Sequence, residues 1–187
     1  TSVLIAGFEC SSVGETAAQI DGISHVLMAD SDLYANNLAE NVAALLADIA
    51  TDFTYILAPA TTSGKNIMPR LAALLDVAQI SDITAVINHD TFERPIYAGN
   101  AIATVQSSDP IKVITVRTTA FDPSPTTENR TQIKMIDAKE GPNLSSFLGQ
   151  ELTESERPEL TSAKIIVSGG RGMQSGDNFP ILEDVAD

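Results

Sequence analysis

The chain contains no tryptophan, a single cysteine and few basic residues. Cys10 cannot form an internal disulfide, which is typical of a reducing compartment. Lysine and arginine number 11 against 25 aspartate and glutamate residues, so the formal charge is −14. Nucleic acid is therefore not an expected partner, because neutralising phosphates needs a basic face. The sequence also lacks an apolar run of the roughly 20 residues that cross a bilayer, so no membrane insertion is expected.

Patterns typical of catalysis and metal binding are also missing. His25 and His89 have no ligand spacing to another histidine or cysteine, so no metal site is expected. Cys10 has no histidine partner implied nearby that would make it a nucleophile. The acids Asp30, Asp32 and Asp90 lack a paired-carboxylate context, which favours roles in solvated turns over acid–base catalysis.

The first part of the chain alternates strand and helix patterns. Short apolar runs at 2–6, 25–28 and 55–58 are predicted as strands. Between them, one apolar stripe recurs at steps of three and four, and a second follows the third run; their members are Leu38, Val42, Leu45, Leu46 and Ile49, then Ile67, Leu71, Leu74 and Leu75. Helices between strands predict right-handed crossovers and a parallel sheet covered on both faces.

The pattern changes at Ile80. Runs at 83–87, 92–97, 101–106 and 112–116 are predicted as consecutive strands, with Gly99-Asn100 as a two-residue hairpin turn. These strands predict an antiparallel extension of the sheet. Residues 122–129 are rich in proline, threonine and other polar residues and are predicted as a surface loop.

The segment Ser63-Gly64-Lys65-Asn66 superficially resembles a phosphate-binding loop. However, Pro59 stands where the first required glycine would be, and Asn66 replaces the serine or threonine that would hold magnesium. A helix N-terminus with Pro69 in an early turn explains the same residues, and we favour that interpretation.

A second domain is predicted after the charged, proline-containing segment at 154–158. An apolar run at 164–167 indicates a buried strand, and a turn carrying Gly170, Arg171 and Gly172 follows it. Asn178 and Pro180 are typical of the cap and first turn of a helix. Glycines let backbone N–H groups approach an anion and Arg171 adds a charge, so the turn suits a nucleotide cofactor. The spacing departs from G-x-G-x-x-G, and a plain structural turn is the alternative.

Several segments resemble a known family in order along the chain. They are Ser63-Gly64-Lys65-Asn66, Ile80-Ser81-Asp82-Ile83, Arg94-Pro95-Ile96-Tyr97-Ala98-Gly99-Asn100-Ala101, Val116-Arg117 and the glycine-rich stretch from Ala163 to Phe179. Together they resemble the alpha subunit of electron transfer flavoprotein. The resemblance implies a fold of the adenine nucleotide alpha hydrolase type at 1–156, which is α/β with a mostly parallel sheet and an antiparallel extension. It also implies the first strand, turn and helix of a Rossmann-like FAD domain at 157–187. The family's first strand and helix are then expected before Thr1, and most of its flavin domain after Asp187.

The resemblance further implies a non-catalytic electron carrier that binds FAD. It implies that Gly170, Arg171 and Gly172 contact the flavin, and that AMP is carried by a partner beta subunit. The implied partners are that beta subunit, acyl-CoA dehydrogenases of fatty acid beta-oxidation and electron transfer flavoprotein-ubiquinone oxidoreductase. The implied location is a bacterial cytoplasm or the mitochondrial matrix.

Two alternatives remain beside this interpretation. One is an adenine-nucleotide-binding α/β module of the universal-stress type, with its ligand at the strand ends near Gly7 and Ala58-Pro59. The other is a purely structural subunit. For the predicted hairpin, docking of Phe92, Ile96, Tyr97 and Ile102 against a beta subunit competes with packing on the chain's own helices.

Overall fold

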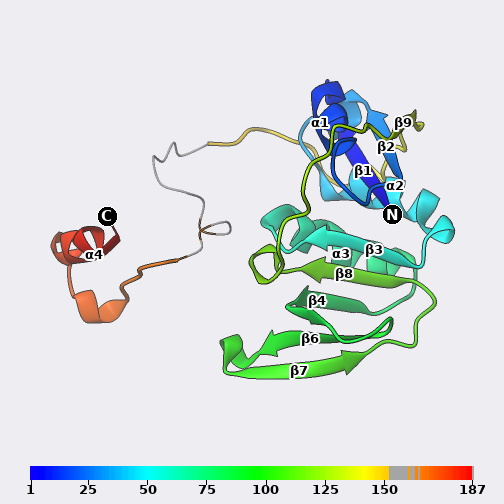
Figure 1. Cartoon of the computed structure of the whole chain (residues 1–187). Helices are drawn as coiled ribbons and strands as arrows, with labels where there is room; N and C mark the ends of the chain where they lie inside the picture. The colour runs from blue at the N-terminus through cyan, green and yellow to red at the C-terminus, as the bar shows by residue number, and fades with distance from the viewer. Residues whose placement is uncertain (152–159, 161–162, 164, 187) are drawn as a thin grey trace. The chain divides into compact units, whose positions relative to one another are not determined.

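The computed structural model describes residues 1–151, 160, 163 and 165–186. It divides into two compact units, Thr1–Gly149 and Gln150–Asp187, which are described separately (Figure 1). The predicted domain boundary between 156 and 157 falls among residues 152–159, outside the described residues, and it stays a prediction.

The first unit is built on two parallel sheets of three strands each. In one, β2 (His25–Asp30) lies between β1 (Ser2–Gly7) and β9 (Gln132–Met135). In the other, β8 (Lys112–Val116) lies between β3 (Tyr55–Pro59) and β4 (Gln79–Ile83). Every one of these pairings is parallel, which confirms the predicted parallel architecture.

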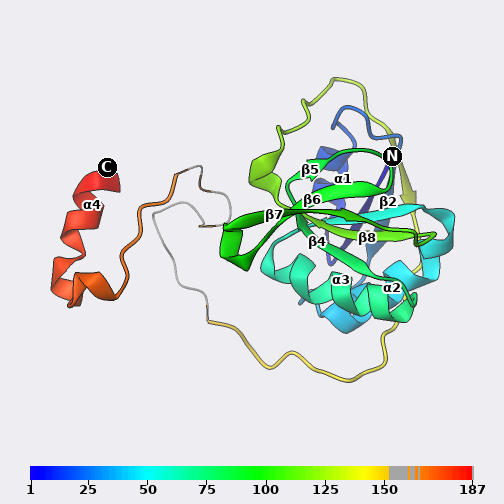
Figure 2. The ribbon, with the colours of Figure 1, turned by 90° about the horizontal axis from the view of Figure 1, so that it is seen from below.

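Helices cover the two faces of these strands. On one face, α1 (Ser11–Ala17) contributes Ala17 to a cluster with Val26 and the partly buried Val3 and Ile5. On the other face, α2 (Ala39–Ile49) and α3 (Thr62–Leu74) bury Leu45 and Leu71 in two adjoining clusters. Figure 2 shows α2 and α3 on the side of the strands opposite to α1. The apolar stripes predicted for both helices are confirmed at Val42, Leu45, Ile67 and Leu71, which are all buried.

An antiparallel sheet forms the third layer of this unit. It contains β5 (Ala85–Val86), β6 (Thr91–Ile96) and β7 (Ala101–Gln106), with β6 in the middle. Phe92 of β6 packs with Ile80, Ile83 and Ile114 of the parallel sheet, so the extension shares its core with β4 and β8. The predicted antiparallel extension is therefore present.

Two strand predictions in this region were wrong in detail. The run 83–87 is not one strand: Ile83 ends β4, and β5 covers only Ala85–Val86. The run 112–116 is not part of the antiparallel sheet, because β8 inserts in parallel between β3 and β4. Val113, Ile114 and Thr115 are all fully buried, and such a run, buried on both faces, is typical of a central parallel strand.

Two backbone details also differ from expectation. The β6–β7 connection is not a two-residue turn at Gly99-Asn100; it is the short 3₁₀ turn η3 (Tyr97–Gly99), in which all three residues have positive φ. Pro69 lies in the interior of α3 and not in an early turn. Strand β9 had no predicted counterpart, since it has only four residues and just one of them, Ile133, packs in a core cluster.

The remaining short helices are η1 (Asp32–Tyr34), η2 (Ala50–Asp52), η4 (Thr118–Ala120), η5 (Arg171–Met173) and η6 (Gly176–Asn178). The last two belong to the second unit, together with α4 (Pro180–Ala186). Pro180 is the first residue of α4, as predicted. The strand predicted at 164–167 is not found: Lys164 lies outside the described residues, and Ile165, Ile166 and Val167 are exposed without strand geometry. An isolated strand has no ladder partner to satisfy its backbone, which explains the difference.

The start of α3 explains the glycine at position 64. A Cβ on Gly64 would collide with the backbone carbonyl oxygen of Pro59. Gly64→Ala should therefore destabilise the protein by about 1–3 kcal/mol through overpacking, measured by urea denaturation. Gly14→Ala is the matched control, since its Cβ would meet the flexible sulfur end of Met28 at 2.8 Å, and it should cost much less. Equal losses in the two variants would contradict this packing argument.

Candidate functional site

The glycine-rich segment of the second unit folds into two successive 3₁₀ turns. In the first, the amide of Met173 donates to the carbonyl of Gly170 at 3.0 Å. In the second, the hydroxyl of Ser175 accepts from the amide of Asp177 at 3.2 Å and caps η6. Asn178 is not the cap of α4; its side-chain amide donates to the carbonyl of Met173 at 2.8 Å and ties the two turns together. The segment is a locally hydrogen-bonded turn that leads into α4.

The glycines of this turn have different roles. A Cβ on Gly169 would lie 2.6 Å from Cγ of Met173 and 2.7 Å from Cδ1 of Leu182, so a side chain there would force both neighbours to move. Gly170 and Gly172 face open space, because a Cβ added at either position would meet nothing within 4 Å. Gly169 therefore sets the packing of the turn, while Gly170 and Gly172 leave its backbone accessible. The sequence prediction selected the latter two and missed Gly169, whose only signal was its place beside Gly170.

Arg171 is the cation of this turn. It is exposed, and within the described residues no acidic side chain lies at ion-pair distance from it. The alternative in which Arg171 simply pairs with a neighbouring acid thus has no support in the described part of the chain. An unpaired guanidinium flanked by accessible glycine backbone suits an anionic group such as a phosphate or a flavin ring.

In the first unit, the strand ends near Gly7 are already occupied by a carboxylate. Asp30 accepts hydrogen bonds from the backbone amides of Glu9 at 2.7 Å and Cys10 at 3.1 Å. These are the amides that would hold a phosphate, and a carboxylate in their place repels one. Burial raises the pKa of the Cys10 thiol, and the nearby Asp30 raises it further, so the thiol is not activated.

The strand end at Ala58-Pro59 is closed in a similar way. Thr61 caps α3 by accepting from the amide of Gly64 at 3.3 Å, and Lys65 lies within the helix. The helix N-terminus therefore meets the Pro59 carbonyl and its own cap. This arrangement supports the helix-cap interpretation of Ser63-Gly64-Lys65-Asn66 and gives no support to a nucleotide at this position.

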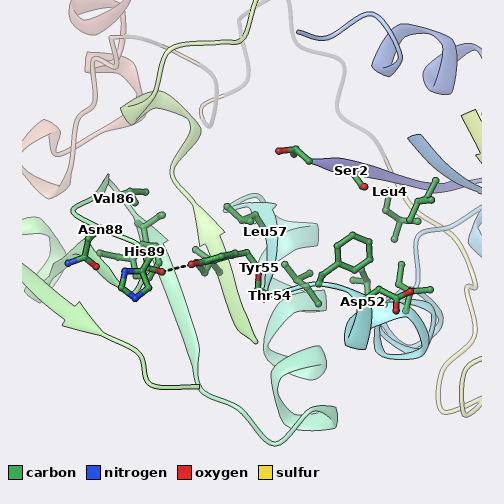
Figure 3. A pocket seen from close by; sticks show the side chains of 18 residues that line it. Ser2, Leu4, Asp52, Thr54, Tyr55, Leu57, Val86, Asn88 and His89 are labelled. Atoms are coloured by element: carbon green, nitrogen blue, oxygen red, sulfur yellow. Dashed lines mark hydrogen bonds between the residues drawn. The ribbon is translucent and has the colours of Figure 1, made fainter. Parts of the chain in front are cut away.

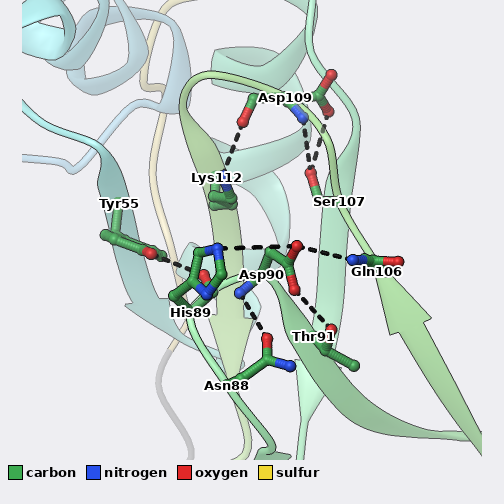
Figure 4. A network of polar contacts seen from close by, with 9 residues as sticks. All are labelled: Tyr55, Asn88, His89, Asp90, Thr91, Gln106, Ser107, Asp109 and Lys112. Atoms are coloured by element: carbon green, nitrogen blue, oxygen red, sulfur yellow. Dashed lines mark hydrogen bonds and ion pairs between the residues drawn. The ribbon is translucent and has the colours of Figure 1, made fainter.

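A polar network connects the loop before β6 to β7 (Figure 4). Asp90 accepts from the hydroxyl of Thr91 at 2.7 Å and from the side-chain amide of Gln106 at 2.7 Å. These donors hold the pKa of Asp90 below its ordinary value. The imidazole of His89 lies 3.9 Å from the same carboxylate, and the His89 carbonyl accepts from the hydroxyl of Tyr55 at 2.6 Å. Asp90 thus has a structural role, joining neighbouring strands.

Two further searches cover the described residues. There, His, Cys, Asp and Glu side chains form no group of three or more that could hold a metal ion. Likewise, none of the helices in the described segments has both the length and the apolar character that crossing a membrane requires.

The comparisons with known proteins agree with this architecture. The sequence profile of the electron transfer flavoprotein domain matches residues 1–140. The chain is 56% identical over 185 residues to the electron transfer flavoprotein subunit alpha of Pseudomonas aeruginosa, an alignment that covers 99% of this chain and 60% of that protein. It is 50% identical over 192 residues to the subunit alpha of Paracoccus denitrificans, covering 100% of this chain and 60% of that protein. The mitochondrial subunit alpha of Dictyostelium discoideum is 43% identical over 201 residues, with coverages of 100% and 57%.

A helix-covered parallel sheet with an antiparallel extension, followed by a glycine-rich turn, defines an α/β protein of the cofactor-associated type. Within that class, the chain belongs to the electron transfer flavoprotein domain family. The family resemblance seen in the sequence is confirmed, and it favours the alpha-subunit side of the family. The chain spans about three fifths of the length of the curated relatives that it matches.

The network around Asp90 gives a pH-dependent prediction. Because the folded state lowers the pKa of Asp90, the carboxylate stabilises the fold above its unfolded pKa of about 3.9, and this stability is lost as pH falls through the folded value. Thr91→Val removes the main donor and should raise the Asp90 pKa, measured from the carboxyl carbon NMR shift against pH. Thr104→Val, on the exposed side of β7, is the control and should leave that titration unchanged. An identical Asp90 titration in the Thr91 variant would contradict the assigned cause.

Proposed function

We propose that this chain is part of the alpha subunit of an electron transfer flavoprotein, and that the turn carrying Arg171 contacts its FAD. The observation that supports the proposal most directly is the exposed Arg171 between two glycines that face open space. When bound, FAD would supply the redox chemistry, accepting and releasing single electrons. The chain itself contributes binding and electrostatics.

The residues of the turn fit such a cofactor. Gly170 and Gly172 would allow the cofactor to approach the backbone closely. The Arg171 guanidinium would donate hydrogen bonds and stabilise negative charge on the cofactor by Coulomb attraction, which strengthens where water is excluded. Gly169, packed on Met173 and Leu182, would position this turn against α4.

A carrier role fits the rest of the described chain. No cluster in the described residues combines a nucleophile, a base and an oxyanion donor. We infer that the protein takes electrons from acyl-CoA and related dehydrogenases and passes them to electron transfer flavoprotein-ubiquinone oxidoreductase. The site of action would be a bacterial cytoplasm or the mitochondrial matrix. AMP would be held by the partner beta subunit, which agrees with the amides of Glu9, Cys10 and Gly64 being already engaged here.

The role of Arg171 can be tested in the full-length alpha subunit paired with its beta subunit. Arg171→Ala should weaken FAD binding by about tenfold, because hydrogen bonds to charged groups contribute about 1.5–3 kcal/mol. Arg171→Lys should recover only part of the affinity, since an ammonium lacks the planar fork. The measurement is the flavin absorbance that each protein retains after gel filtration, with its reduction potential as a second readout. Arg130→Ala, a change at an exposed arginine of the first unit, is the control, and unaltered retention and potential in Arg171→Ala would refute the assignment.

The β6–β7 hairpin is the surface we propose for contact with the beta subunit. Phe92 is buried in the chain's own core, so that part of the expected docking surface was wrong. Tyr97 is 80% exposed and Ile102 is 56% exposed, which leaves an apolar edge and tip. The three positive-φ residues of η3 cost backbone strain, and they hold the Tyr97 side chain at the tip of the hairpin.

Tyr97→Asp should therefore leave the fold intact and abolish association with the beta subunit. A charged side chain is tolerated in water, but it is costly in an apolar interface. Co-purification of the two subunits measures association, and far-UV circular dichroism measures the fold. Phe121→Asp, which changes another exposed aromatic residue of the same unit, is the control. Normal co-purification of the Tyr97 variant would exclude the hairpin tip from the interface.

A further inference from the structure

The two parallel sheets of the first unit each end in an unpaired strand. Among the described residues, β1 pairs with β2 alone and β3 pairs with β8 alone. Each strand therefore presents backbone N–H and C=O groups on its free side. Such groups are satisfied by water or by another strand.

A cavity of about 770 Å³ lies between these two free edges (Figure 3). Ser2 and Leu4 of β1 line it from one side, and Tyr55, Ile56 and Leu57 of β3 line it from the other. Both strands thus border the cavity with their amino-terminal halves, which means that they run in the same direction along it.

The cavity is lined by side chains from both faces of the parallel strands. Ile56 belongs to the cluster beneath α3, together with Leu71. Leu57 pairs in register with Ile114, whose side chain packs with Phe92 on the opposite face. Since Ile56, Leu57 and Ile114 all line the cavity, it cuts through the plane of the sheet and is not a groove on one side.

This shape matches one kind of occupant, a β-strand. A strand fills the space between two strand edges, pairs with both, and sends alternate side chains to the two faces. Because both flanking strands run the same way, an occupant parallel to them would complete a continuous parallel sheet. Its side chains would be apolar on both faces, as in other central parallel strands.

The handedness of the fold indicates where this strand comes from. The step from β1 through α1 to β2 leads away from the cavity, with α1 on the face of Val3 and Ile5. A strand in the cavity that continued through a helix into Thr1 would take the same direction. A right-handed crossover then puts its helix on the same face as α1. On that face Tyr55 and Leu57 of β3 are 37% and 56% exposed, although they belong to a parallel strand.

We propose that this cavity is the seat of an apolar β-strand that runs parallel to β1 and β3 and is supplied by the same polypeptide on the amino-terminal side of Thr1. The strand joins the two parallel sheets into one, and the helix that follows it covers Tyr55 and Leu57. This proposal does not depend on the flavin assignment, since it concerns only the first unit.

Amide hydrogen exchange tests the proposal directly. The chain 1–187 is compared with the polypeptide extended by the residues that its gene encodes upstream of Thr1. In the extended protein, amides of β1 and β3 that face the cavity should exchange at least about tenfold more slowly. Amides of β8, which are paired on both sides already, are the internal reference and should change little.

A pair of leucine variants sharpens the test. Leu57 is 56% exposed and lines the cavity, whereas Leu74 at the end of α3 is 58% exposed and does not. In the extended protein, Leu57→Asp should restore fast exchange in β1 and β3, and Leu74→Asp should not. Retained protection of β8 shows that each variant is folded.

Three results would overturn the proposal. They are an absence of coding residues upstream of Thr1, equal exchange in the short and extended proteins, and protection that appears only when a beta subunit is added. The last result would assign the cavity to a partner chain. Loss of protection at β8 in Leu57→Asp calls for the milder Leu57→Asn, and slow exchange of β1 and β3 in that folded variant would equally count against the proposal.

Discussion

The strand β8 is the element on which the first unit depends. It pairs in parallel with β3 on one side and β4 on the other, and Val113, Ile114 and Thr115 are fully buried. Val113 faces the core under α3, and Ile114 faces the core shared with the antiparallel sheet. A single short strand therefore holds the helical layer and the antiparallel layer together. A polar substitution at Ile114 would separate β4 and β6, whose clusters meet at this residue.

Satisfaction of backbone amides decides where a cofactor can bind. In parallel α/β folds the carboxyl ends of the strands are the usual ligand site, because free amides gather there. Here the amides of Glu9 and Cys10 donate to Asp30, and the amide of Gly64 donates to Thr61. These donors of the first unit are thus engaged by its own side chains. The accessible backbone and unpaired cation lie in the turn around Arg171, which is why we assign the cofactor contact to the second unit.

Sequence periodicity predicted the parts of the fold in which burial is one-sided or continuous. The stripes in α2 and α3 and the limits of β7 and β8 agree with the structure. Periodicity failed where backbone conformation overrides it: Asp82, with φ of 58°, ends the regular pairing of β4, and its carboxylate pairs with Arg117. It also assigned β8 to the wrong sheet, because strand direction is not encoded in the apolar pattern. For the site, glycine spacing located the turn but could not separate Gly169, which packs, from Gly170 and Gly172, which do not.

The exposure of Arg171 sets a condition on its electrostatic role. In water a unit charge at 4 Å contributes about 1 kcal/mol, and this rises to about 4 kcal/mol near a protein surface. An arginine that remains in bulk solvent would therefore bind a cofactor weakly and hardly change its potential. The turn acts on a flavin only when further polypeptide covers the exposed Ile165, Ile166 and Val167 beside it and excludes water. The same apolar run that fails to form a strand alone is thus the surface through which the complete cofactor site would be assembled.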